Sequence, residues 1–375
     1  MPASVALRSA GKSLYTREYF TYTGIDSNGY PTGLAPIQTS TGGPISANLE
    51  YGIARDPKTA AATNLKSEYQ DEYILGFDKQ LNDTWTFGAK ATYRNLRAAI
   101  DDVGDTGAIE DKMTAMGIDP ADVGTIYGSY LFNPGQTNIF KIAKADGSGY
   151  YDVPMTNADF HFNTTLKRKY YALELYLEHA FDGKWFGKVD YLFSRSYGNS
   201  EGQVRTDIGQ EDVSATVDWD YSYVMDYANG ALANDRRHQI KAYGSYQLTP
   251  EWMLSGNLAI LSGAPKTCLG YYGAGETNPG LGYGDYYHFC YGEISSPGKS
   301  RQDWTYTLSL GAEYRPEWAG RKLAFNATVY NVFDQQKITQ TYANAGDKAE
   351  PDPSYNSPVT SQTPRYVRFG VSYDF

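Results

Sequence analysis

The chain has 375 residues, with 33 Lys and Arg against 43 Asp and Glu, which gives a net charge of −10. This acidic balance, without a basic block, argues against a nucleic-acid-binding protein. No apolar stretch reaches the ~18 residues that a membrane-spanning helix needs, but the 35 Tyr and 38 Gly are residue types that suit membrane interfaces and tight turns.

The first clear elements are two strands within residues 69–94. Apolar and polar side chains alternate there with a period of two, and the turn Asn82-Asp83-Thr84 separates the two runs. This pattern predicts a β-hairpin with one apolar face and one polar face.

A long connection is predicted over residues 100–162, and its first part is acidic. Carboxylates suit Ca²⁺, but their spacing does not match an EF-hand loop. A solvated acidic surface is therefore preferred over a calcium site. The acidic residues are Asp101, Asp102, Asp105, Glu110, Asp111, Asp119 and Asp122.

Three further hairpins follow, and each has the same alternation around a short turn. They cover residues 170–193, 236–260 and 304–329. Long connections separate or follow them, at residues 207–235, 262–301 and 335–363. Short turns at one end of the strands and long loops at the other are typical of outer-membrane β-barrels, whose long loops are extracellular.

Tryptophan recurs at one place in the hairpins. Trp85, Trp185 and Trp252 each follow a short turn directly, and Trp318 lies inside the fourth turn. Such a repeat predicts an aromatic girdle at one membrane boundary. The alternative is that each Trp packs only on its own hairpin.

The polar face of the strands is strongly charged, while the other face is continuously apolar. A soluble core would not accept so many charges, and water would not suit the apolar face. Lipid outside and a wet lumen inside satisfy both faces. A soluble β-sandwich or propeller is the alternative, but no period of 40–50 residues marks propeller blades. The charged residues are Arg168, Glu174, Glu178, Lys188, Asp190, Lys241 and Glu313.

Two cysteines, Cys268 and Cys290, flank a segment rich in Gly and Tyr. Neither has a CxxC partner, so we expect a loop disulfide in an oxidising compartment, with two free thiols as the alternative. The clustered aromatic rings suggest ligand contact, and the alternative is that they pack the loop over the lumen. The candidate ligand-binding residues are Tyr271, Tyr272, Tyr283, Tyr286, Tyr287 and Tyr291.

Catalytic and metal motifs are not evident. The four histidines, His161, His179, His238 and His288, lie far apart in the sequence. No H-E-x-x-H pattern occurs, and no Ser/His pairing is evident. We therefore expect no enzyme, no cofactor and no metal site.

The last strand has a specific pattern. Val367, Phe369, Val371, Tyr373 and Phe375 share one face, and the chain ends on the aromatic residue. This resembles the C-terminal signature of outer-membrane proteins that the barrel assembly machinery recognises as the closing strand.

Three motifs carry a resemblance to the TonB-dependent receptors. Residues 323–334, which end in Asn-Val-Phe-Asp, resemble a strand near the end of that family's barrel. The run from Asn234 to Gln239 resembles its D-x-R-H motif, and residues 261–265 resemble the S-G-x-P strand end of the Oar-like branch. With Phe375, these motifs cover roughly residues 160–375, and residues 1–160 carry no recognised motif.

The resemblance implies an all-β, antiparallel transmembrane β-barrel with long extracellular loops. About ten strands are expected here, out of the 22 of such transporters. Residues 1–375 are then a C-terminal portion of the barrel without the plug domain, and since residues 1–20 lack the apolar core of a signal peptide, export requires a signal upstream.

The expected function is TonB-dependent uptake of a scarce ligand across the outer membrane of a Gram-negative bacterium. A saccharide or a peptide is favoured over a siderophore, and the chain alone is expected not to transport. Expected partners are outer-membrane lipid, the barrel assembly machinery and, through the missing plug, the TonB complex. The alternative is a complete barrel of 10–12 strands acting as a porin, protease or phospholipase.

Overall fold

The structure is a computed structural model, and it describes residues 20–37, 56–210, 213–276 and 283–375. The chain divides into two compact units, one made of Met1–Leu65 and Asp102–Asp159, the other of Lys66–Asp101 and Phe160–Phe375. No helix in the described ranges is both long enough and apolar enough to cross a membrane.

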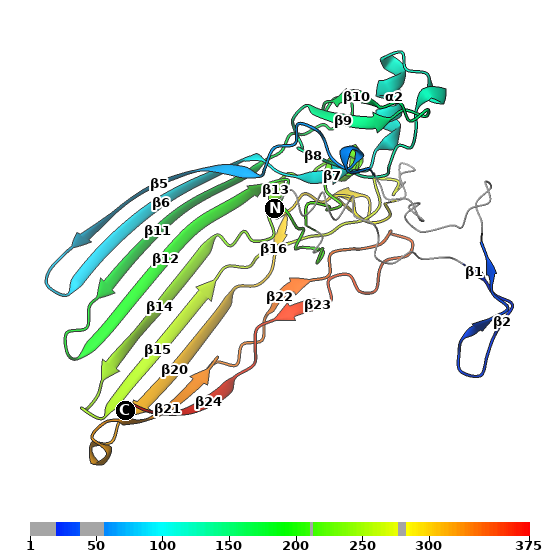
Figure 1. The fold of residues 1–375 in the computed structure, drawn as a ribbon. Helices are drawn as coiled ribbons and strands as arrows, with labels where there is room; N and C mark the ends of the chain where they lie inside the picture. The colour runs from blue at the N-terminus through cyan, green and yellow to red at the C-terminus, as the bar shows by residue number, and fades with distance from the viewer. Residues whose placement is uncertain (1–19, 38–55, 211–212, 277–282) are drawn as a thin grey trace. The chain divides into compact units, whose positions relative to one another are not determined.

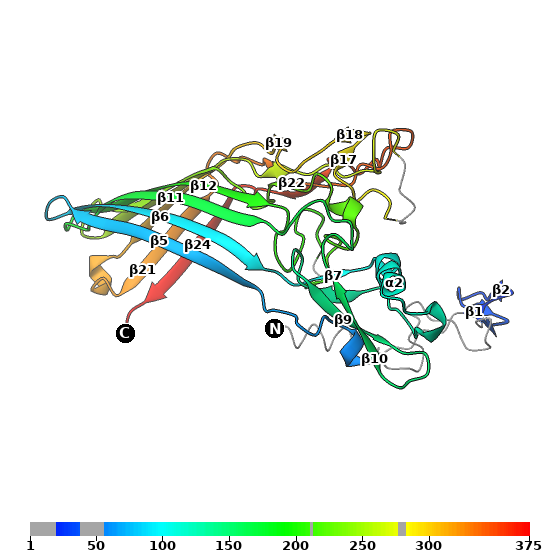
Figure 2. The same ribbon diagram turned by 90° about the horizontal axis from the view of Figure 1, so that it is seen from above.

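A ten-stranded antiparallel sheet dominates the second unit (Figure 1). Its strands are β5 (Tyr69–Gln80), β6 (Trp85–Ala98), β11 (Arg168–His179), β12 (Trp185–Gly198), β13 (Gly230–Ala231), β14 (His238–Gln247), β15 (Trp252–Leu261), β20 (Thr305–Tyr314), β21 (Leu323–Tyr330) and β24 (Tyr366–Tyr373). Figure 2 shows that the sheet is curved like the wall of a barrel. The all-β, antiparallel fold and the strand number predicted from the sequence are confirmed.

The sheet is open in the described residues. Nine long strands follow one path from β24 to β5, and the two-residue strand β13 pairs with β12 off this path. Each neighbouring pair is antiparallel. With an odd number of alternating strands, the two edge strands β5 and β24 run in the same direction. A direct pairing of these two edges would therefore be parallel.

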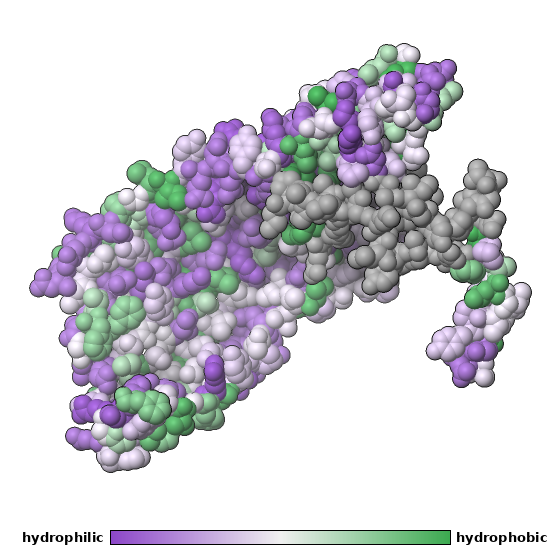
Figure 3. All heavy atoms as spheres, viewed as in Figure 1, coloured by the Kyte–Doolittle hydropathy of each residue, from purple (hydrophilic) through white to green (hydrophobic). Residues whose placement is uncertain are grey.

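The two faces of the sheet differ as the alternation predicts. On one face Leu75 and Phe369 are 79% and 78% exposed. On the other, Lys90 and Glu174 form an ion pair at 3.1 Å across neighbouring strands, and the Tyr176 hydroxyl donates to Asp78 at 2.6 Å. Figure 3 shows hydrophilic residues spread over much of the sheet on the side that faces the viewer.

The short turns fix the positions of the recurrent tryptophans. The Asn82 side chain accepts a hydrogen bond from the Trp85 amide at 2.9 Å, and Asp182 accepts one from the Trp185 amide at 3.0 Å. Thr249 does the same for the Trp252 amide at 3.1 Å. A short polar side chain at the first turn residue thus fixes where the return strand begins.

The Trp rings contact neighbouring strands as well as their own hairpins. The ring centroids of Trp85 and Trp185 are 5.7 Å apart, although they belong to different hairpins. Trp252 stacks on Tyr314 of β20 at 4.7 Å. These contacts argue against the alternative that each Trp packs only on its own hairpin. The position of the Trp rings at a membrane boundary stays a prediction.

Residues 100–162 are more ordered than the sequence suggested. They contain β7 (Asp101–Val103), β8 (Tyr130–Phe132), β9 (Asn138–Ala143), β10 (Tyr150–Met155) and the helix α2 (Thr106–Ala115). The sequence predicted a long connection here but not these elements, because strands this short leave little periodicity in the sequence.

Three acidic residues of this segment accept structural hydrogen bonds. Asp105 accepts a hydrogen bond from the Ala108 amide at the start of α2, and Asp119 accepts one from the Ala121 amide. Asp101 is buried and accepts from the amide and hydroxyl of Thr216 at 2.9 Å. In the described part of the chain no group of three or more His, Cys, Asp or Glu side chains is arranged to hold a metal.

The remaining elements are short. They are β1 (Phe20–Thr21), β2 (Gly24–Ile25), β3 (Pro31–Thr32), β4 (Ala35–Pro36), β16 (Pro265–Lys266), β17 (Phe289–Cys290), β18 (Glu293–Ile294), β19 (Ser300–Arg301), β22 (Ile338–Thr341) and β23 (Pro358–Ser361), with 3₁₀ turns η1 (Pro57–Thr59), η2 (Pro120–Asp122), η3 (Ser222–Met225) and η4 (Glu317–Ala319).

Candidate ligand-binding site

Two of the sequence motifs meet at one end of the sheet. Asp235, of the D-x-R-H run, is buried and accepts hydrogen bonds from the Ser196 amide at 2.6 Å and from the Arg301 guanidinium. Ser262, of the S-G-x-P run, accepts from the His238 amide at 3.0 Å. The next residue, Gly263, leaves no room for a side chain, since a Cβ there would lie 1.6 Å from the Gln302 carbonyl oxygen.

The third motif, Asn-Val-Phe-Asp, directly follows β21 and forms hydrogen bonds with residues just before β24. The Asn331 side chain donates to the carbonyls of Gln335 and Thr363 at 2.9 and 2.8 Å. Asp334 accepts from the Arg365 amide at 2.8 Å, just before β24 begins. All three motifs therefore fix strand ends and the loops that leave them.

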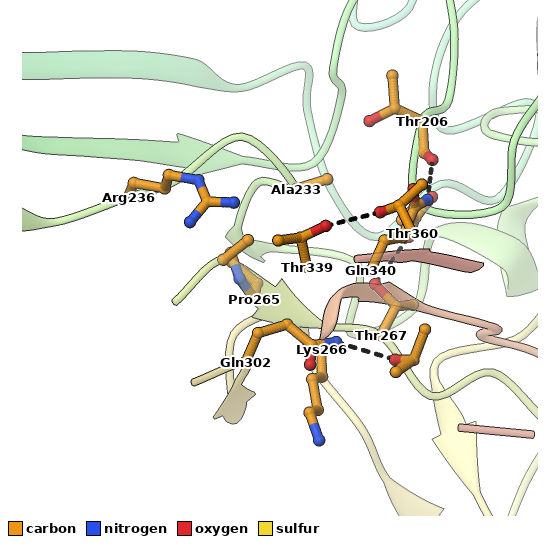
Figure 4. A pocket seen from close by; sticks show the side chains of 13 residues that line it. Thr206, Ala233, Arg236, Pro265, Lys266, Thr267, Gln302, Thr339, Gln340 and Thr360 are labelled. Atoms are coloured by element: carbon orange, nitrogen blue, oxygen red, sulfur yellow. Dashed lines mark hydrogen bonds between the residues drawn. The ribbon is translucent and has the colours of Figure 1, made fainter. Parts of the chain in front are cut away.

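A cavity of about 260 Å³ lies beside these strand ends. It is built from segments that are far apart in the sequence, and Figure 4 shows its lining. The lining residues are Thr206, Asp207, Ala233, Arg236, Ala264, Pro265, Lys266, Thr267, Gln302, Thr339, Gln340, Thr341 and Thr360. Most of these side chains carry hydroxyl, amide or charged groups, and none is aromatic.

Side-chain hydrogen bonds hold the walls of this cavity together. Gln340 donates to the Thr206 carbonyl at 2.9 Å, and Gln302 donates to the Thr341 hydroxyl at 3.0 Å. In Figure 4 these bonds tie the strand β22 to two different loops. These hydrogen bonds therefore hold the walls of the cavity in place.

Two cations line the cavity. Arg236 donates from Nη1 to the Ser262 carbonyl at 2.9 Å, and burial lowers the pKa of its guanidinium below the ordinary value, although an arginine stays protonated at neutral pH. The Lys266 ammonium lies 3.5 Å from the Asn356 side-chain oxygen. Neither cation forms a carboxylate ion pair within 4.0 Å among the described residues, so both favour a negatively charged group in the cavity.

A buried charge network supports one wall. The Arg205 guanidinium contacts Asp207 at 3.0 Å and Asp218 at 2.9 Å, and the Thr267 hydroxyl donates to Asp207 at 2.9 Å. Burial works against ionisation of Asp207, but the Arg205 charge and the hydrogen bonds from Arg205 and Thr267 together outweigh it and lower the pKa of this carboxyl. Asp207 is thus held as an anion by partners that already satisfy it, leaving the two cations to attract a ligand.

Two further groups of this network titrate in unusual ranges. Burial raises the pKa of Asp218 to about 6. Burial, together with the Arg205 charge, lowers the pKa of His288 to about 3, so its imidazole is neutral at physiological pH. The network therefore changes charge only on acidification.

The tyrosine-rich loop is closed by the disulfide that was expected from the sequence. Cys268 and Cys290 form a disulfide with their Cα atoms 5.6 Å apart. Tyr287 is fully buried in a cluster with Val224 and Phe289, and burial raises the pKa of its hydroxyl to about 12.

The other tyrosines of this loop also make internal contacts. The Tyr272 hydroxyl donates to Asp226 at 2.7 Å, and the Tyr283 hydroxyl donates to Asp220. Tyr286 packs against the Tyr283 ring at 6.4 Å, Tyr291 packs against Tyr355, and Tyr271 is half-buried. These contacts favour the packing interpretation, and ligand contact by the six tyrosines stays a prediction.

The terminal strand lies at the sheet edge. Val367, Phe369, Val371 and Tyr373 are each at least half exposed on β24, and Phe375 is fully exposed. Their role as an assembly signal stays a prediction. The polar cavity was missed by sequence analysis, although Arg236 and Pro265 in its lining belong to two of the recognised motifs.

Comparisons with known proteins agree with the motifs. The chain is 23% identical over 361 residues to the TonB-dependent transporter Oar of Myxococcus xanthus, covering 84% of this chain and 29% of that protein. It thus spans less than a third of the length of this relative. No family model matches the chain.

Solved structures of transporters also match the chain at low identity. The outer membrane transporter YddB from Escherichia coli matches with 12% identity and a TM-score of 0.48, over 84% of this chain and 34% of that one. The FrpB iron transporter from Neisseria meningitidis matches with 12% identity and a TM-score of 0.45, over 84% and 33%. The similarity to the Oar transporter confirms the resemblance to TonB-dependent, Oar-like transporters of the Gram-negative outer membrane. The names of these relatives describe transporters.

Proposed function

We propose that this chain, which resembles the TonB-dependent transporters, forms part of the barrel wall and part of the ligand-binding surface of such a transporter. It would act only within a larger closed barrel. The observation that carries this proposal is the direction of the two sheet edges, β5 and β24.

The edges disfavour closure of this chain on itself. Every outward-pointing backbone group at an open edge in lipid lacks a partner, which costs several kcal/mol for each group. Bacterial single-chain barrels have an even number of antiparallel strands, whereas the path from β24 to β5 has nine. Joining β5 to β24 would require a parallel pairing.

A second copy in the same membrane orientation does not solve the problem. Its edges also run in the direction of β5 and β24, so every junction between the two copies would be parallel. Completion of an antiparallel barrel needs an odd number of further strands, beginning and ending with strands of the opposite direction. This reasoning argues against the alternative of a self-contained porin, protease or phospholipase.

The side chains that line the polar cavity suit an acidic ligand that also forms hydrogen bonds. Arg236 and Lys266 favour an anion, and the threonine and glutamine side chains suit hydroxyl or amide groups. The volume of about 260 Å³ is small compared with the ~300–1,000 Å³ of drug-sized sites. We therefore favour one acidic sugar unit, or one acidic side chain of a peptide, over a whole siderophore.

Energised uptake by the complete transporter would require the TonB complex. In the family that this chain resembles, the plug domain makes that contact. We accordingly assign binding and wall formation to this chain, and energy transfer to the remainder of the transporter.

The ligand assignment is tested with Arg236→Gln and Lys266→Ala in the complete transporter. A hydrogen bond to a charged group is worth ~1.5–3 kcal/mol, so each variant should weaken binding about 10- to 150-fold. The assay is titration against panels of acidic and neutral oligosaccharides and peptides. Lys337→Ala is the matched control, because this lysine pairs with Asp303 at 2.8 Å outside the cavity. Equal affinity in all four proteins would exclude the cavity as the binding site.

The wall assignment is tested by mass. The form of this gene product in the outer membrane should be much larger than 41.6 kDa. A stable, heat-modifiable barrel of 41.6 kDa would contradict it and restore the small-barrel alternative.

A further inference from the structure

An apolar cavity of about 320 Å³ lies on the face of the sheet that carries the turn-flanking tryptophans. Its walls include Trp85, Leu177, Trp185, Val189 and Leu258. If the chain is barrel wall, as proposed above, this face meets the membrane. A hollow there is filled by lipid or by an apolar partner.

The hollow arises from a row of glycines that crosses three strands. Gly187 of β12 is in register with Gly244 of β14, and Gly244 is in register with Gly256 of β15. The rows on either side carry larger side chains, such as Val189 with Leu258 on one side and Trp185 with Leu254 on the other. The missing side chains therefore leave a groove between two apolar walls.

A buried histidine lies at one end of this row, with its Nε2 3.7 Å from the Asp182 carboxylate. His179 of β11 is in register with Gly187 and is only 4% exposed. Its ring stacks on Trp185 at 3.7 Å and meets Trp85 edge-on at 4.9 Å. Among the described residues its Nδ1 has no hydrogen-bond partner, which is unusual for a buried polar atom.

A cation stands at the same rim. Lys184, in the short turn before β12, places its ammonium 5.1 Å from the centre of the Tyr246 ring. Tyr246 is in register with Trp185, one row beyond the glycines. Gly187 lies three positions after Lys184, or ~10 Å along an extended chain, so the cation and the groove belong to one end of the sheet.

We infer that this groove binds a phospholipid of the periplasmic leaflet, with an acyl chain over Gly187, Gly244 and Gly256 and an anionic phosphate at Lys184. The leaflet follows from the short turns, which are periplasmic in outer-membrane barrels. The occupant is thus an anionic glycerophospholipid and not lipopolysaccharide, which belongs to the opposite leaflet.

The decisive variant fills the groove without disturbing the strands. A Cβ at Gly256 would lie 3.5 Å from the nearest atom, a side-chain carbon of Leu310, which is an ordinary contact. Gly244 is unsuitable, because a Cβ there would lie 2.5 Å from the Phe186 carbonyl oxygen. Gly256→Leu is therefore the test, and Ala312→Leu is the matched control, since Ala312 lies on the same face outside the groove.

The experiment is native mass spectrometry of the complete protein, purified from outer membranes and mixed with phosphatidylglycerol, phosphatidylcholine or lipopolysaccharide. The wild type and Ala312→Leu should retain one phosphatidylglycerol, and Gly256→Leu should lose most of it. Lys184→Gln, in an exposed turn, should keep acyl binding but lose the preference for phosphatidylglycerol over phosphatidylcholine, by about fivefold for one lysine.

The outcomes separate this inference from the proposed function. Equal lipid retention by the wild type and Gly256→Leu would show that the groove is not the lipid-binding site. Preferential retention of lipopolysaccharide would contradict the assignment of the leaflet and of the lipid class. Absence of the protein from the outer-membrane fraction would instead contradict the barrel assignment itself.

Discussion

The buried carboxylate of Asp235 should be the most sensitive single site in the ligand-binding half of the sheet. Its side chain is fully buried and pairs with the Arg301 guanidinium, which is 22% exposed. It also accepts the Ser196 amide at 2.6 Å. Removing it in Asp235→Ala leaves a largely buried guanidinium and a backbone amide without this partner.

The magnitude follows from the loss of one partner in a buried pair. Such a loss costs ~3–5 kcal/mol, and the residual exposure of Arg301 places the expected cost near the lower end, at about 3 kcal/mol. Asp235→Asn keeps an acceptor oxygen and should lose less. Because Asp235 joins three segments, the loss should also loosen the polar cavity beside it.

The measurement is the urea midpoint of the complete protein in detergent micelles, with limited proteolysis of the loops as a local readout. Asp303→Ala is the matched control, since Asp303 is 66% exposed in its ion pair with Lys337 and such pairs are worth ~0–1 kcal/mol. If Asp235→Ala and Asp303→Ala shifted the midpoint equally, the assignment of Asp235 as a structural anchor would be refuted.

Two further predictions concern pH and backbone space. The pKa of His288 is lowered to about 3, so as pH falls the unfolded chain binds this proton before the folded chain does. The free energy of unfolding should therefore decrease as pH drops below ~6.5. Asp218 has a pKa raised to about 6 and opposes this effect, because its contribution to the free energy of unfolding grows as pH falls through 6. His288→Gln should therefore remove the acid-induced loss in a pH series of loop proteolysis, and an unchanged pH profile would argue against a buried neutral imidazole. Gly263→Ala should prevent folding of the barrel end, since its Cβ would lie 1.6 Å from the Gln302 carbonyl oxygen, whereas Gly256→Ala makes only ordinary contacts. Heat-modifiable migration on a gel compares the two variants. Equal migration would show that the backbone at Gly263 can shift to make room.

Much of the sheet was predictable because its information is local. In a strand successive side chains point to opposite faces, so alternation alone locates strands such as β5 and β11 and assigns their faces. Turn residues such as Asn82 and Asp182 fix where the next strand starts through hydrogen bonds spanning three residues. The recurring tryptophans are the first residues of the strands that begin after these turns.

The motifs were recognised in the sequence, but their physical roles were not. Nothing near Asp235 in the sequence points to Arg301, its partner 66 residues away. Residues 100–162 were misjudged for a related reason, because strands such as β7 and β8 are three residues long and too short to show a period. In both places the stabilising contacts are distant in sequence.

The sequence by itself determined an antiparallel, two-faced sheet with charges on one side and apolar residues on the other. Only the tertiary structure decided that its two edges run in the same direction, that Arg236 and Lys266 share one cavity, and that three glycines form one row. Each of these depends on strand order, register or loop packing, which are set by pairings between distant residues and not by the pattern within any one strand.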